Sequence, residues 1–87
     1  MEKTIKLECG FECTIDDVAL DNIAFVDLLA DYEDNPLLIG KVAKMLFGKN
    51  TNALYDFVRT DDGRVPIKSI TDAVEQAFNA LGEEEKN

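Results

Sequence analysis

The side chains of this chain that could do chemistry are mainly carboxylates. Asp61-Asp62-Gly63 could form the second half of a calcium-binding loop. With Gly63 at the sixth position of such a loop, the first and twelfth positions are Val58 and Ser69. A calcium loop needs carboxylates at both of these positions. The spacing therefore predicts a turn that leads into a helix, and we expect no metal site.

The remaining acidic groups and the single serine also lack the partners that a reaction needs. Asp16–Asp17 and Asp31–Asp34 contain neighbouring carboxylates, but the chain has no nucleophile beside a base and no glycine-rich phosphate loop. Ser69 does not lie in the Asp-Ser-Leu motif that carries the phosphopantetheine arm of acyl carrier proteins. Histidine, the commonest general base and metal ligand, is absent. We therefore expect no enzyme, no catalytic residue and no cofactor.

Cys9 and Cys13 are the two cysteines, in the spacing Cys-x-x-x-Cys. A zinc site needs further ligands, and neither a second cysteine pair nor a histidine is present. A disulfide is not expected in a protein that is not secreted. We interpret both residues as small apolar side chains of a hairpin.

The charge of the chain excludes further classes of function. The 87 residues contain 18 Asp and Glu against 9 Lys and Arg, for a net charge of −9. Nucleic-acid binding relies on Lys and Arg, and anionic membranes repel acidic proteins. The sequence has no apolar run of about 20 residues and no basic, apolar leader. We therefore expect a cytoplasmic protein that binds other proteins, and no nucleic-acid or membrane partner.

Residues 3–15 alternate between apolar and polar side chains, which is typical of a strand pair with one buried face. Paired apolar residues must share parity for one face of the hairpin to be apolar. A three-residue loop over 8–10, with Gly10 in the left-handed conformation, meets this condition. It places Leu7 opposite Phe11 and Ile5 opposite Cys13.

Helical spacing of apolar residues follows, and we expect helices over about 22–33, 36–47, 51–58 and 66–81. Asp21 is the expected N-cap of the first helix, whose apolar stripe contains Phe25, Leu28, Leu29, Tyr32, Ile23, Val26 and Ala30. Asn35-Pro36 predicts a cap followed by a proline at the first helical position. Gly48 and Gly82 are expected helix ends. The sequence thus predicts an α+β fold with one domain over 1–82, and a frayed acidic tail over 83–87.

The second predicted helix is apolar on nearly all sides, so it is central in the core, part of an interface, or both. Lys41 and Lys44 are its only basic pair. They either offset neighbouring acids or set the register of an acidic partner or a second copy. The candidate residues for contacts with a client or with a second copy are Leu37, Lys41, Lys44, Met45 and Phe47.

Six stretches of the chain form a recognisable layout, in which Gly63-Arg64-Val65 before an amphipathic helix is the most distinctive part. The stretches are Ile5–Leu7, Gly10–Glu12, Phe25–Ala30, Asn35–Leu37, Met45–Gly48 and Asp61–Pro66. This layout resembles the small tail assembly chaperones of long-tailed bacteriophages and prophages of Gram-positive bacteria. The resemblance covers nearly the whole chain.

The resemblance implies a non-enzymatic role in the cytoplasm of a bacterial host. Such proteins keep the long tape measure protein soluble and help the tail tube subunits to assemble around it, and they are not expected in the mature virion. The implied partners are the tape measure protein and, as a further candidate, the tail tube protein. A homo-oligomer remains open.

An acidic regulatory protein that mimics nucleic acid and inhibits a DNA-binding protein is the alternative function. Such a decoy needs carboxylates in regularly spaced rows on its surface. The acidic residues of this chain are instead scattered at predicted helix ends and in the tail. We therefore expect a tail assembly chaperone in preference to a decoy.

Overall fold

An antiparallel hairpin of β1 (Glu2–Lys6) and β2 (Glu12–Asp16) opens the fold, in the computed structural model that describes residues 2–16, 18 and 21–85. Ile5 pairs with Cys13, and the backbone N–H of Leu7 donates to the carbonyl of Phe11 at 2.8 Å. Gly10 has a φ of 105°. The predicted register and three-residue loop are therefore confirmed.

One face of the hairpin supplies part of the core. The buried side chains of this face are Ile5, Leu7, Phe11, Cys13 and Ile15. The other face is polar and exposed, and there the hydroxyls of Thr4 and Thr14 lie 3.2 Å apart. This alternation places the hairpin against the helices, as its period of two predicts.

The first helix, α1 (Ile23–Asp34), starts one residue later than its predicted cap implies. Asn22 is the N-cap: its backbone is extended, and its side chain accepts a hydrogen bond from the backbone N–H of Ala24 at 3.0 Å. The prediction that Asp21 caps this helix is therefore wrong. Both residue types are good caps, so the extended backbone of Asn22 decides which of them occupies the cap position.

Asn35 and Pro36 take their predicted roles. The Asn35 side chain accepts from the backbone N–H of Leu37 at 3.2 Å, and Pro36 begins the 3₁₀ turn η2 (Pro36–Leu38). This turn leads directly into α2 (Ile39–Phe47), so the predicted helix over 36–47 begins with a tighter turn. Gly48, with a φ of 54°, ends α2 as predicted.

The 3₁₀ turn η3 (Gly48–Asn50) connects α2 to α3 (Thr51–Val58), whose bounds match the prediction. The last helix, α4 (Ile67–Glu85), continues past Gly82, so its predicted end is wrong. A glycine inside a helix costs only about 1 kcal/mol relative to alanine, and the glutamates that follow are good helix formers. Residues 83–85 of the predicted tail are thus helical, and 86–87 lie outside the described residues.

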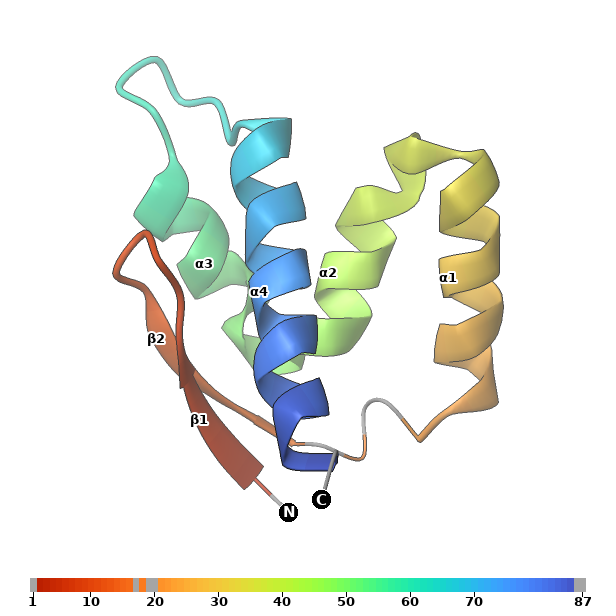
Figure 1. Cartoon of the computed structure of the whole chain (residues 1–87). Coiled ribbons are helices and arrows are strands. Elements are labelled where there is room, and N and C mark those ends of the chain that lie inside the picture. Colours follow the sequence, from red (N-terminus) through yellow and green to blue (C-terminus); the bar gives the residue numbers. More distant parts are fainter. Residues whose placement is uncertain (1, 17, 19–20, 86–87) are drawn as a thin grey trace.

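Helix α2 occupies the centre of the fold, between α1 and α4 (Figure 1). The hairpin packs on the side of α4 that faces away from α1, next to α3 (Figure 1). Helix α2 buries Ile39, Val42, Ala43, Leu46 and Phe47. The structure confirms the predicted α+β class, with four α-helices among the described residues.

Helix α1 packs through only one of its apolar faces. Phe25 is buried, and Leu28, Leu29 and Tyr32 are half-buried against the core. Ile23 and Val26 are 74% and 50% exposed, and Ala30 is also exposed. These three residues do not widen the core stripe as expected, because α1 lies at the edge of the fold with core residues on one side only.

Candidate protein-binding surface

An open groove of about 540 Å³ lies between α1 and α2. The two helices are neighbours in the chain and run in opposite directions (Figure 1). The apolar side chains in the groove belong to Ala24, Leu28 and Met45. Leu28 is half-buried and Met45 is 36% exposed, so apolar surface remains accessible between the two helices.

The charged side chains of the groove are divided by sign between its two walls. Asp27 and Asp31 stand one turn apart on α1, while Lys41 and Lys44 stand about one turn apart on α2. All four are exposed. Within the described residues, none of the four forms an ion pair or a side-chain hydrogen bond. These four charged groups are therefore available to a partner.

The structure brings together three of the predicted contact residues, Lys41, Lys44 and Met45, which all line this groove. Leu37 lies outside the groove, in the connection between the helices, and is 81% exposed. Phe47 is only 2% exposed and belongs to the core, so its place among the predicted contact residues is corrected. The residues that follow Met45 on α2, Leu46 and Phe47, are buried and are not accessible to a partner.

The α1 wall of the groove was not predicted from the sequence. The helical pattern of α1 predicts that Leu28 lies in the core and that Asp27 and Asp31 are solvated. Their joint position depends on how α1 packs on α2, which the periodicity of one helix does not specify. Ile23, Val26 and Ala30, which widen the apolar stripe of α1, do not line the groove, so that pattern gave no signal for it.

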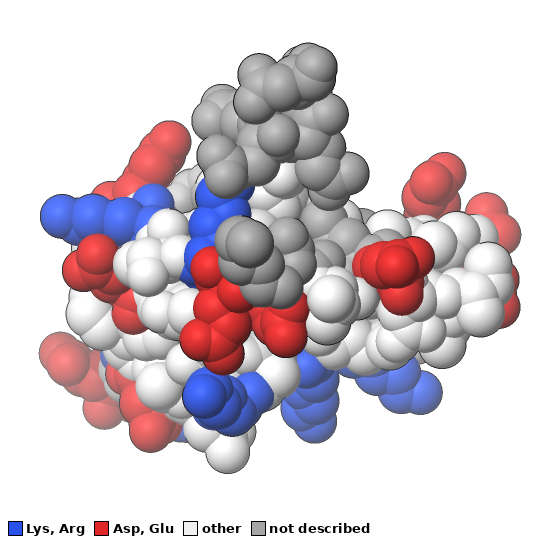
Figure 2. All heavy atoms as spheres, turned by 90° about the horizontal axis from the view of Figure 1, so that it is seen from below, with Lys and Arg blue, Asp and Glu red and all other residues white. Residues whose placement is uncertain are grey.

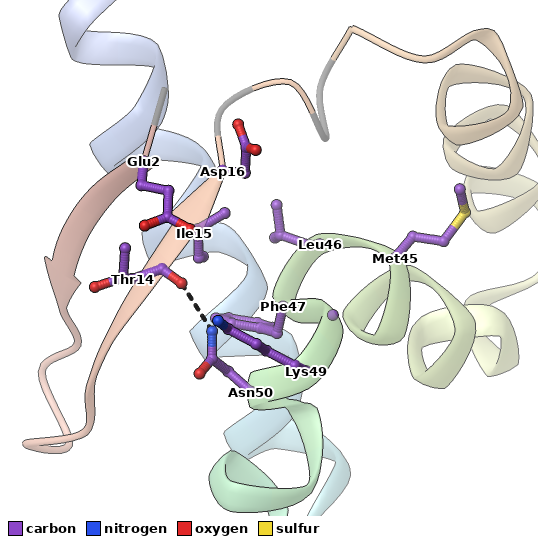
Figure 3. A pocket seen from close by; sticks show the side chains of 10 residues that line it. Glu2, Thr14, Ile15, Asp16, Met45, Leu46, Phe47, Lys49 and Asn50 are labelled. Carbon is purple, nitrogen blue, oxygen red and sulfur yellow. Dashed lines mark hydrogen bonds between the residues drawn. The ribbon is translucent and has the colours of Figure 1, made fainter.

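A second hollow, of about 280 Å³, lies between β2 and the end of α2 (Figure 3). The Asn50 side-chain amide donates to the carbonyl of Thr14 at 2.8 Å and joins η3 to β2. Leu46 points toward Ile15 at the inner side of the hollow, whereas Met45 points away toward α1 (Figure 3). We interpret this hollow as the junction between hairpin and helices.

Two acidic residues that are paired in the strand register, Glu2 and Asp16, both line this second hollow. The backbone N–H of Val18 donates to the Asp16 carboxylate at 3.1 Å and lowers the pKa of that group. A general acid needs a raised carboxyl pKa, so Asp16 does not have the properties of a general acid.

In the turn around Gly63, the carboxylate of Asp62 accepts hydrogen bonds from neighbouring residues of the same loop. The Thr60 hydroxyl donates to Asp62, and Arg64 Nε lies 2.9 Å from the same carboxylate. These two hydrogen bonds lower the pKa of Asp62. No group of three or more metal-binding side chains gathers among residues 2–16, 18 and 21–85.

The two cysteines differ in their exposure to solvent. Cys9 is exposed in the loop and Cys13 is buried, and both are free thiols. Burial raises the pKa of the Cys13 thiol, which opposes the formation of a reactive thiolate. Cys13 therefore serves as a core residue.

The acidic side chains on the face seen in Figure 2 form separate groups with basic side chains between them. A surface that mimics the backbone of a nucleic acid needs a continuous series of negative charges, since phosphates follow one another at regular spacing. The described residues on the face in Figure 2 carry no such series.

No family model, curated protein or solved structure matches the chain significantly. Within the part of the chain that the structure describes, no helix combines the length and the apolar character that crossing a membrane requires. The α1–α2 groove is thus the feature from which a function can be argued.

Proposed function

We propose that this protein is a tail assembly chaperone of a long-tailed phage or prophage, which binds the tape measure protein and assists tail tube assembly without catalysis. The observation that carries the proposal is the open apolar groove between α1 and α2 in a strongly acidic chain. The sequence resemblance selects the client, and the groove supplies a binding mode. We expect the protein to act in the host cytoplasm and to be absent from the mature virion.

The groove fits the needs of a chaperone for helical clients. Helical segments of a tape measure protein expose apolar stripes until the tail tube surrounds them. An amphipathic helix buries such a stripe when it lies in an apolar groove. Leu28 and Met45 offer the apolar surface for this contact. Methionine adapts its shape to different side chains, which suits a groove that binds apolar helix faces.

The charge of the chain supports the same role. A chaperone bound to an apolar client must keep the complex soluble, and the net charge of −9 opposes association between complexes. The lysines on α2 place positive charge beside the groove, where an acidic flank of a client helix can pair with them.

Co-expression with the tape measure protein of the same phage tests the proposal. We expect the tape measure protein to become soluble and to co-purify with this chain, whereas it should be insoluble when expressed alone. Replacing Met45 by Glu should reduce the recovered complex, because it puts a charge into the apolar part of the groove. Val26→Glu is the matched control, since Val26 is exposed on α1 outside the groove. A client that stays insoluble, with no complex recovered, would contradict the proposal.

A further inference from the structure

Each wall of the α1–α2 groove carries two like charges that repel each other. Asp27 and Asp31 occupy i and i+4 positions on α1, and like charges at this spacing destabilise a helix. Lys41 and Lys44 occupy i and i+3 positions on α2 and repel each other in the same way. No ion pair within the described residues relieves either repulsion. A partner with positive charge opposite α1 and negative charge opposite α2 would relieve both.

A second copy of this chain presents that arrangement. A two-fold dimer uses the same patch on both subunits, so the patch must be complementary to itself. The groove meets this condition because its acidic wall and its basic wall each carry two charges about one turn apart. We propose that two copies associate through this groove, with the acidic wall of each copy against the basic wall of the other.

The positions of the charges along the groove determine the direction of the two-fold axis. Helices α1 and α2 are antiparallel and joined by η2 (Figure 1), so Asp31 and Lys41 lie near the joined end. Asp27 and Lys44 lie farther from it. An axis parallel to the groove sets Asp31 of one copy opposite Lys41 of the other, and Asp27 opposite Lys44. An axis across the groove sets aspartate against aspartate, so the parallel axis is the favoured one.

The apolar residues of the groove take the central place in this dimer. Ala24, Leu28 and Met45 of both copies meet between the charged walls. An apolar centre with a charged rim is the usual arrangement of protein interfaces. Met45, which is 36% exposed in the single chain, becomes buried on association. The charges fix the orientation and the apolar residues contribute the buried area.

The dimer and the client complex use the same groove, so they are alternatives. A client helix displaces the second copy, and the apolar surface is covered in both states. This consequence rests on the proposed function, whereas the dimer itself does not.

Sedimentation velocity of the full chain over a wide concentration range tests the dimer. We expect a monomer–dimer equilibrium in which the fraction of dimer rises with protein concentration. The double variants Asp27→Lys/Asp31→Lys and Lys41→Glu/Lys44→Glu should each weaken the dimer by about 10- to 100-fold. An equimolar mixture of the two variants should form heterodimers, since every contact between the walls is then again between opposite charges.

A control variant distinguishes an effect of the groove charges from an effect of the net charge. Lys6→Glu/Lys49→Glu changes the net charge as much as the lysine variant but lies outside the groove, and it should dimerise like the wild type. Circular dichroism verifies that each variant is folded. A wild-type chain that is monomeric at all concentrations overturns the proposal. A dimer that the groove variants leave intact, or a mixture without heterodimers, also overturns it. If only the chaperone role fails, the protein should still dimerise, but no tape measure protein should co-purify with it.

Discussion

The ring of Phe25 on α1 stacks on the ring of Phe78 on α4, with the centroids 5.7 Å apart and the planes at 25°. Phe25 is 1% exposed and is among the largest fully buried side chains of the described residues. The two rings connect the outermost helix to the longest one. This contact, together with the packing of α1 on α2, holds α1 and with it one wall of the groove.

Phe25→Ala should lower the free energy of unfolding by about 3–5 kcal/mol, since it removes the ring and leaves a cavity. A domain of this size has a total stability of about 5–15 kcal/mol, so the loss should appear as a large fall in melting temperature. Thermal unfolding followed by circular dichroism measures it. Val26→Ala, next to it on the exposed face, should change stability by less than about 0.5 kcal/mol. Equal effects of the two changes would contradict the placement of α1.

The glycines of the hairpin loop and of α2 should respond to alanine in opposite directions. Gly10 has a φ of 105°, which an alanine adopts only with strain, so Gly10→Ala should destabilise the fold by about 1–2 kcal/mol. Gly40 lies inside α2, and an added methyl group meets only the Tyr55 hydroxyl at 3.8 Å. Gly40→Ala should therefore stabilise the fold by about 0.5–1 kcal/mol. Urea unfolding of both variants tests this pair, and a stabilising Gly10→Ala would refute the left-handed loop.

The hairpin and the groove differ in how far the sequence predicts them. Alternating parity over 3–15 favoured the three-residue loop, which pairs Leu7 with Phe11, over a two-residue loop, which pairs Leu7 with Glu12, so the register followed from the local pattern. The groove combines Leu28 of one helix with Met45 of another. Their relation depends on the packing of α1 and α2, and many packings satisfy the same two helical stripes. The sequence therefore pointed to the α2 wall alone.

The helix ends were also only partly predictable from the sequence. Asp21 and Asn22 are both strong cap residues, so residue type alone did not decide between them. Gly82 is a common helix stop, yet α4 continues through it. Gly48 ended its helix as predicted, because the chain turns there into η3 and the hairpin side of the fold. End signals are thus reliable only where the tertiary structure also requires the chain to turn.

The loop before α4 should make stability depend on pH in the acid range. Hydrogen bonds from Thr60 and Arg64 lower the pKa of Asp62 below its ordinary value of 3.8. The ionised carboxylate therefore stabilises the folded chain above that value, and this contribution is lost as the pH falls through the lower folded pKa. Asp62→Asn should be less stable than the wild type at neutral pH.

Urea unfolding from neutral pH into the acid range measures this effect. The difference between the wild type and Asp62→Asn should shrink once the pH falls below the ordinary aspartate range. Asp61→Asn, in the same turn, is the matched control. A difference that stays constant with pH would show that the Asp62 side chain acts without its charge.

The two cysteines should react with iodoacetamide at clearly different rates. Cys9 is exposed in the loop, whereas Cys13 is buried on the core face of β2 and burial raises the pKa of its thiol. Only the thiolate attacks the reagent, so both burial and protonation protect Cys13. Mass spectrometry of the native protein should show one alkylation, at Cys9, with the second appearing only when denaturant unfolds the chain. Cys9→Ser should leave a protein that is unreactive until it unfolds. Rapid alkylation of Cys13 in that variant would mean that the hairpin separates from the helices in the native state, because its register places Cys13 beneath them.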